Sequence, residues 1–211
     1  AGITTGDDNV AVGQSAGGGS TTISQSVFIG REAGDAISTG NANIAVGYGS
    51  MGGSATTGNW NIAIGYDAGD AITTGYENVF IGKDTGGAVT DGYYNTAIGS
   101  NALKVATNNS GNVVVGYAAF DAADAGESYN VVIGYGAGGS QNNASTDGNI
   151  MIGASSFTGG TGANIGNIAI GDNALDGTGN NAQTGTIALG YQSLGALTTG
   201  AGNLAIGYKS M

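Results

Sequence analysis

Apolar and polar positions recur along the chain in one fixed order, seen clearly in Asn61-Ile62-Ala63-Ile64-Gly65. A short period that covers a whole chain is typical of a solenoid, in which each repeat forms one coil and packs on its neighbours. The copies begin 17 to 19 residues apart, at Asn9, Ser26, Asn43, Asn61, Asn78, Asn95, Asn112, Asn130, Asn149, Asn167, Thr186 and Asn203.

The columns of the repeat predict a strand. With the Asn counted as position 0, positions 1 and 3 are aliphatic in nearly every copy, as in Ile62 and Ile64, and Thr96 is the exception. Side chains alternate along a strand, so these two positions share a face, and β-branched residues at this spacing favour strands. We expect this face to be the dry interior of each coil. The fold class that follows is all-β: a parallel β-solenoid of about twelve coils of 17–19 residues, forming a single domain over residues 1–211.

Position 2 points the other way from positions 1 and 3, and it is also apolar in every copy. An apolar column on the outside of a solenoid would form a long hydrophobic stripe, which soluble monomers rarely expose. We therefore predict that position 2 packs against other copies of the chain. The predicted interchain residues are Ala11, Phe28, Ala45, Ala63, Phe80, Ala97, Val114, Val132, Met151, Ala169, Ala188 and Ala205.

Three further columns indicate tight turns and a polar ladder. Position 4 is Gly in every copy, which suggests a positive φ angle or a backbone too crowded for a Cβ atom. Position 7 is always small, and position 8 is either Gly or a large apolar residue, which indicates a tight corner with a variable filler. The Asn side chains at the start of the strands can stack into a hydrogen-bonded ladder.

The strand motif and the small corner that follows it resemble a known group of repeats. Asn95-Thr96-Ala97-Ile98-Gly99-Ser100-Asn101-Ala102-Leu103 is similar to the head repeats of YadA-like trimeric autotransporter adhesins and to β-roll repeats of phage tail fibres. The resemblance implies a left-handed β-roll, three chains around an axis and a surface-exposed attachment role. The position-2 stripe itself indicates oligomerisation; the number three comes from the resemblance alone.

We accordingly expect an extracellular homotrimer or filament, on a virion tail fibre or on a bacterial cell surface. Its work would be structural and adhesive, with a cell-surface glycan or protein as receptor. Because the chain opens in the tail of one repeat and stops inside another, we expect it to be a section of a longer fibrous chain.

Composition excludes several other functions. The formal charge of −11 disfavours nucleic acid as a partner, and no apolar run approaches the ~20 residues needed to span a membrane. The chain has no His and no Cys, which removes the usual catalytic triads and the common zinc ligands. We expect no catalytic, cofactor-binding or metal-ligating residues, and no enzyme activity.

Three weaker patterns remain as alternatives. Gly47–Gly52 and Gly134–Gly139 match a dinucleotide-binding spacing, but that site requires a following helix, and no helical period is present. A carboxylate pair could hydrolyse glycosides in a trimeric polysaccharide depolymerase; the candidates are Asp67 with Asp70, and Asp121 with Asp124. Adjacent threonines suggest an ice-binding solenoid, although neighbours on a strand point to opposite sides; the pairs are Thr4-Thr5, Thr21-Thr22, Thr56-Thr57 and Thr73-Thr74.

Position 5 carries the one candidate set of ligand contacts. Such a column of tyrosines could stack against sugar rings, or it could pack at a junction between subunits. The residues are Tyr48, Tyr66, Tyr117, Tyr135, Tyr191 and Tyr208.

Overall fold

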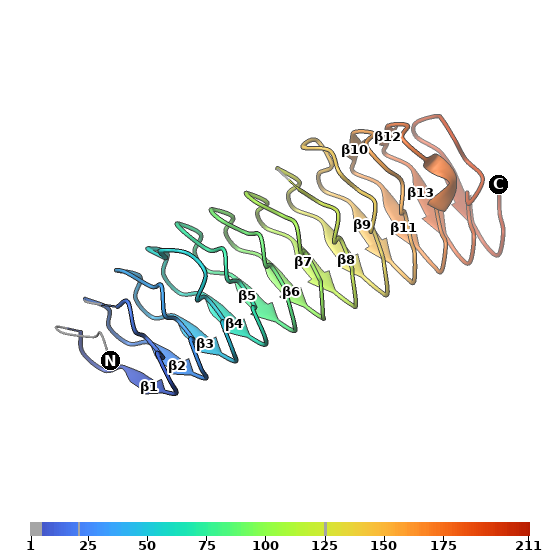
Figure 1. Cartoon of the computed structure of the whole chain (residues 1–211). Helices are drawn as coiled ribbons and strands as arrows, with labels where there is room; N and C mark the ends of the chain where they lie inside the picture. Colours follow the sequence, from blue (N-terminus) through green and yellow to red (C-terminus); the bar gives the residue numbers. More distant parts are fainter. Residues whose placement is uncertain (1–5, 21, 125) are drawn as a thin grey trace.

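The computed structural model describes residues 6–20, 22–124 and 126–211, and over them the chain forms an elongated solenoid (Figure 1). Each coil adds one short strand to a parallel sheet of twelve strands, and consecutive coils are neighbours in that sheet. The first and last coils therefore lie at opposite ends of the molecule. The prediction of an all-β parallel solenoid is confirmed.

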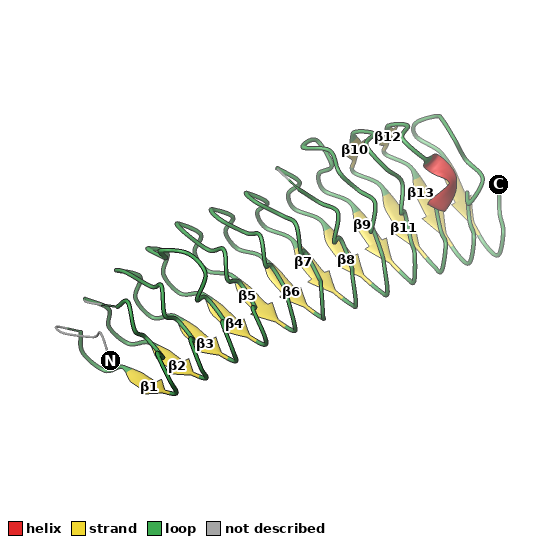
Figure 2. Cartoon of the chain, viewed as in Figure 1, coloured by secondary structure: helices red, strands yellow, loops and turns green. Residues whose placement is uncertain are grey.

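The strands occupy one side of the solenoid, and turns complete each coil (Figure 2). The sheet consists of β1 (Val10–Val12), β2 (Val27–Ile29), β3 (Ile44–Val46), β4 (Ile62–Ile64), β5 (Val79–Ile81), β6 (Thr96–Ile98), β7 (Val113–Val115), β8 (Val131–Ile133), β9 (Ile150–Ile152), β11 (Ile168–Ile170), β13 (Ile187–Leu189) and β14 (Leu204–Ile206). Near the C-terminal end, β10 (Asn164–Ile165) pairs with β12 (Gln183–Thr184), and a 3-10 helix, η1, spans Asp176–Thr178.

The interior of the solenoid is built from position 2, so the predicted orientation of the strand is wrong. Phe80 and its counterparts from β2 to β13 are fully buried within the single chain, and Ala205 is nearly so; Ala11, in β1, is exposed. Strict register keeps this column aligned, as where Ala63 pairs with Phe80. The residues expected to contact other chains instead form the core: Phe28, Ala45, Ala63, Phe80, Ala97, Val114, Val132, Met151, Ala169, Ala188 and Ala205.

The core has a narrow cross-section, and positions 2 and 8 share its volume. Where position 2 is Phe80, position 8 is Gly86, and a Cβ atom there would lie 2.8 Å from the phenyl ring. Where position 2 is Ala97, position 8 is Leu103, which is fully buried. In these two coils the large side chain comes from one position or the other, although the ninth coil buries both Met151 and Phe157.

Position 4 needs glycine because neighbouring coils approach closely at that corner. A Cβ atom at Gly65 would overlap the carbonyl group of Gly82 in the next coil, and φ at Gly65 is 140°. That φ lies in the region that L side chains avoid. The same overlap recurs from coil to coil, for example between Gly99 and Gly116. The crowded corner inferred from the sequence is confirmed.

The Asn column forms the expected ladder, and it is fully buried except at its two ends, Asn9 and Asn203. Asn78 Oδ1 accepts hydrogen bonds from both the backbone N and Nδ2 of Asn95, each at 3.0 Å. Asn95 Nδ2 also donates to the carbonyl of Asn109, at 2.6 Å, which holds the end of the same coil against its beginning. The amide therefore joins neighbouring coils and closes its own coil with one side chain.

Candidate functional site

The outer face of the twelve-stranded sheet is aliphatic along its whole length. Its side chains come from positions 1 and 3, which point away from the core, and none of them is fully buried. The exposed hydrophobic stripe that the sequence led us to expect therefore exists, but on the columns assigned to the interior. We call these residues the aliphatic face: Val10, Val12, Val27, Ile29, Ile44, Val46, Ile62, Ile64, Val79, Ile81, Thr96, Ile98, Val113, Val115, Val131, Ile133, Ile150, Ile152, Ile168, Ile170, Ile187, Leu189, Leu204 and Ile206.

The aliphatic face is large for a single chain. At ~4.8 Å between strands, twelve strands span roughly 50 Å, and three residues per strand add a width of about 10 Å. The resulting patch of roughly 500 Å² is at the upper end of what a typical monomer exposes. It carries no charged side chain, and Thr96 is its one polar member. A hydrophobic patch of this size is often functional.

Exposed aromatic residues border the aliphatic face at the start of the strands. Trp60, Tyr94 and Tyr129 occupy the position before the Asn, and Trp60 is 60% exposed. Trp60 lines a hollow of about 470 Å³ together with Glu77 and Val79, and Val79 belongs to the aliphatic face. Sequence analysis overlooked this column; reading the position before each Asn coil by coil would have found it.

The tyrosines of position 5 form three stacked pairs on the opposite edge of the strands. Ring centroids are 5.1 Å apart in the first pair, 5.4 Å in the second and 5.3 Å in the third. The predicted Tyr column is thus brought together in adjacent coils, and cations lie over some of the rings: Arg31 over Tyr48, Lys83 over Tyr66, and Lys209 over Tyr191 and Tyr208. The pairs are Tyr48 with Tyr66, Tyr117 with Tyr135, and Tyr191 with Tyr208.

The first tyrosine pair borders a hollow of about 300 Å³, which we call the acidic hollow. The third coil contributes Gly49, Gly52 and Gly53 to its lining, and Asp67 Oδ1 lies where a Cβ atom of Gly49 would be. Tyr48, Tyr66 and carboxylates of the flanking coils complete the lining. The carboxylates are Glu32 and Asp35 from the second coil and Asp67 and Asp70 from the fourth.

The carboxylates of the fourth coil are poorly compensated. Burial, followed by the nearby carboxylate of Asp84, raises the pKa of Asp67 above its ordinary value. Burial, followed by repulsion from Asp67 and Asp84, raises the pKa of Asp70 in the same direction. Among the described residues, neither forms an ion pair within 4.0 Å. Asp67 and Asp70, the first of the two predicted carboxylate pairs, both line the acidic hollow.

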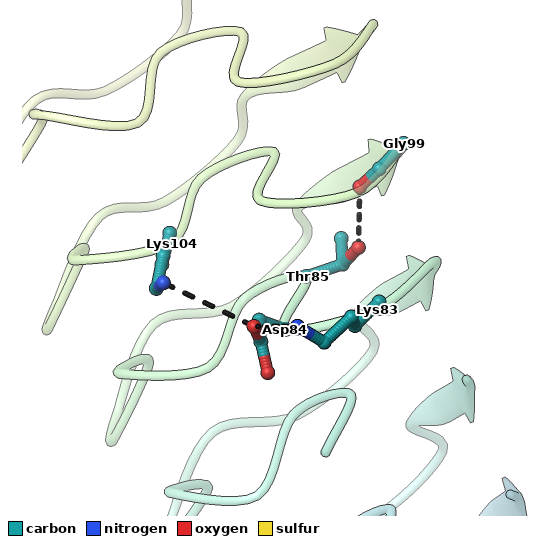
Figure 3. Close-up of polar contacts among 5 residues, drawn as sticks. All are labelled: Lys83, Asp84, Thr85, Gly99 and Lys104. Carbon is teal, nitrogen blue, oxygen red and sulfur yellow. Dashed lines mark hydrogen bonds and ion pairs between the residues drawn. The ribbon is translucent and has the colours of Figure 1, made fainter. Parts of the chain in front are cut away.

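An adjoining hollow of about 310 Å³ shares Asp67 and Asp70 as its wall but is electrostatically different. Figure 3 shows why: Asp84 lies between two lysines, with Lys83 Nζ at 3.4 Å and Lys104 Nζ at 3.9 Å from its Oδ2. The hydroxyl of Thr85 donates to the carbonyl of Gly99 at 2.5 Å and fixes the corner of that coil. The acidic hollow has no lysine or arginine in its lining, although Arg31 Nη2 pairs with Glu32 Oε1 at 3.0 Å.

The glycine-rich pattern does not form a dinucleotide site. Gly47–Gly52 follows β3, but a turn comes next, and η1 is the one helix among the described residues. In the second carboxylate pair Asp121 is half-buried and Asp124 is exposed, and burial raises the pKa of Asp121. Glu32 and Asp35 are not among the residues predicted above; comparison of positions 6 and 9 between neighbouring coils would have placed them beside the glycines.

The threonine pairs divide between the interior and the surface. Thr56 is buried and donates to the carbonyl of Ile72 at 2.6 Å, whereas Thr57 is exposed. Adjacent threonines therefore do not share a flat outer surface in this coil. Thr4, Thr5 and Thr21 lie outside the described residues.

Comparison of the chain with protein-family models, with curated proteins and with solved structures gives no match. Among the described residues, no group of three or more acidic side chains lies close enough together to hold a metal ion. Over the same residues, no helix has the length and apolar character required to cross a bilayer. The surface features of the solenoid are therefore the basis for assigning a function.

Proposed function

We propose that the chain is a rigid structural segment of an extracellular attachment fibre, assembled from three copies that pack through their aliphatic faces. The supporting observation is the aliphatic face itself, an uncharged sheet surface of roughly 500 Å² in outline. A standard interface buries about 800 Å² of accessible surface per partner, and side-chain relief makes accessible area larger than outline area. Burial of this face can therefore sustain a stable assembly.

The partner that best fits the aliphatic face is another copy of the chain. The face repeats every ~4.8 Å along its length, so an identical face can match it along all twelve strands. Aromatic side chains at the start of the strands, such as Trp60, are of the kind enriched at interface anchors. The number three follows the resemblance to trimeric fibre repeats, and so does display on a virion tail fibre or a bacterial surface.

Single introduced cysteines test this arrangement, because the chain has none of its own. In a trimer with its axis along the aliphatic face, a Cys at Ile98 of β6 lies near the same residue of the other copies. We expect Ile98→Cys to give covalent trimers with a trifunctional maleimide reagent. Val105→Cys, on an exposed turn residue outside the sheet, serves as the matched control. Equal crosslinking of both variants, or none with Ile98→Cys, would contradict the proposed interface.

A trimeric polysaccharide depolymerase is the second candidate. The observation in its favour is the raised pKa of Asp70, since a general acid in glycoside hydrolysis needs a carboxyl that stays protonated. Release of new reducing ends from a polysaccharide, abolished in Asp70→Asn, would support it. Binding to a surface without such release supports the attachment role.

A further inference from the structure

We propose that the hollow beside Trp60 receives the Lys83 side chain of a neighbouring copy of the chain, so that the two edges of the aliphatic face form one interface. This inference rests on the proposed fibre and names the residues that join adjacent copies. The hollow measures about 470 Å³ and is lined by Trp60, Glu77 and Val79. Its lining combines apolar surface with one carboxylate, which matches the aliphatic stem and the terminal ammonium group of a lysine.

Glu77 supplies a carboxylate that is not paired within its own chain. It is exposed, and among the described residues it forms no ion pair within 4.0 Å. Trp60, on the other wall of the hollow, is 60% exposed, although tryptophan is highly buried on average. The acid and the aromatic wall are therefore both open to a partner.

Rotational symmetry determines which part of a second copy faces the hollow. When the symmetry axis runs along the solenoid, rotation brings the start of each strand next to the end of the same strand in the next copy, at the same height. The residue before the Asn, at position −1, and the residue at position 5 each lie three residues from position 2. Position −1 of one copy therefore faces position 5 of the next, with each coil against the same coil.

The residues at these two positions are complementary in the fourth and fifth coils. In the fifth coil, Glu77 at position −1 faces Lys83 at position 5 of the next copy. In the fourth coil, Trp60 faces Tyr66. Lys83 Nζ lies 5.9 Å from the centroid of the Tyr66 ring, so these two side chains approach the hollow together. Within one chain, β5 and its flanking residues separate Glu77 from Lys83 by roughly 15–20 Å, which is too far for an ion pair.

Lys83 is available for this contact. Its side chain is 63% exposed, and its ammonium group lies 3.4 Å from the carboxylate of Asp84. Lys104 Nζ lies 3.9 Å from the same carboxylate oxygen (Figure 3). Asp84 therefore keeps one cation when Lys83 turns to Glu77 of the neighbouring copy.

Other arrangements of two copies leave the Glu77 carboxylate without a cation. A stagger of one coil, as a screw axis would produce, brings Ser100 or Tyr66 opposite Glu77. A twofold axis across the solenoid brings the starts of the strands together, and position −1 carries no Lys or Arg in any coil. A rotation axis along the solenoid, with the chains parallel and in register, provides the complementary charge.

Exchange of the two charges tests this contact. Glu77→Lys and Lys83→Glu each place like charges together, which should weaken each contact at least about threefold. Three symmetry-related contacts multiply this loss to about thirtyfold in the association of a trimer. The double variant Glu77→Lys with Lys83→Glu should recover most of the loss. Sedimentation equilibrium over a concentration series at low ionic strength measures association, and high salt should reduce the differences.

The matched control is Glu77→Lys with Lys104→Glu. This variant has the same net charge as the exchanged pair, and Lys104 also lies near Asp84, but Lys104 does not occupy position 5. It should not restore association. Circular dichroism should show that all variants are folded, because the three substituted residues are exposed.

The outcomes separate this inference from the proposed function. A wild-type trimer in which Lys83→Glu rescues Glu77→Lys no better than Lys104→Glu does overturns the contact and leaves the fibre proposal standing. Rescue by Lys83→Glu in an assembly of two copies supports the contact and contradicts the number three. A monomeric wild type contradicts both proposals.

Discussion

Glu127 is the one charged residue that is fully buried among the described residues, and it forms no ion pair within 4.0 Å. Neither carboxylate oxygen has a hydrogen-bond partner, and Nδ2 of Asn109 also lacks one. Burial raises the pKa of Glu127, and repulsion from Asp124 adds to this effect; the nearby N–H groups of Glu127 and Asn143 and the amide of Asn109 oppose it, but none of them has hydrogen-bond geometry to either oxygen. The balance favours a neutral carboxyl group inside the folded coil.

Replacement of Glu127 by Gln should therefore make the chain more stable at neutral pH. Because folding raises this pKa, the contribution of Glu127 is greatest below the unfolded value of 4.5 and is lost as pH rises through the folded pKa. Guanidinium unfolding midpoints should be higher for Glu127→Gln than for wild type near pH 7, and should converge near pH 4. A lower midpoint for the variant near pH 7 would show that the ionised carboxylate is stabilised by a partner.

At the scale of the element, the strand and the corner that follows it form one packing unit. The β-branched residues at positions 1 and 3 identified the strands correctly. Because position 2 is also apolar, the alternation of side chains did not show which face of the strand is buried. The missed signal was the inverse relation between positions 2 and 8 that many of the coils show, such as Phe80 with Gly86 against Ala97 with Leu103. Only side chains that share one interior need to compensate in volume.

If positions 2 and 8 share the core volume, a large side chain introduced at position 8 should restore stability lost at position 2. Phe80→Ala alone should reduce the free energy of unfolding by about 3–5 kcal/mol, because it leaves a cavity. Adding Gly86→Leu should restore about half of that loss, since it reproduces the sixth coil; the left-handed φ of 59° at Gly86 costs the new side chain on the order of 1 kcal/mol.

The control for the exchange is Phe80→Ala with Gly87→Leu. Gly87 lines the surface hollow beside Lys104, so a leucine at that position cannot fill the cavity. Chemical denaturation of the four proteins measures the effect. Equal stability of the two double variants would mean that positions 2 and 8 do not share the core volume.

At the scale of the whole molecule, the repeat period in the sequence was sufficient to predict the solenoid, its parallel strands and its Asn ladder. The acidic hollow was not predicted, because it arises from side chains of three successive coils and from the glycines between them. The aliphatic face was expected on the wrong columns, and its existence changes the test of assembly. A charge at Phe80 would disrupt the core, whereas a charge at Ile98 reaches the outer face alone.

Solution mass by light scattering tests the central claim most directly. We compare wild type, Ile98→Asp in the middle of the aliphatic face, and Val105→Asp as an apolar-to-acid control on a turn. Wild type and Val105→Asp should have three times the 20.3 kDa chain mass, and Ile98→Asp should lower the mass while circular dichroism remains that of the folded solenoid. A monomeric wild type, or an unchanged threefold mass in Ile98→Asp, would contradict assembly through the aliphatic face.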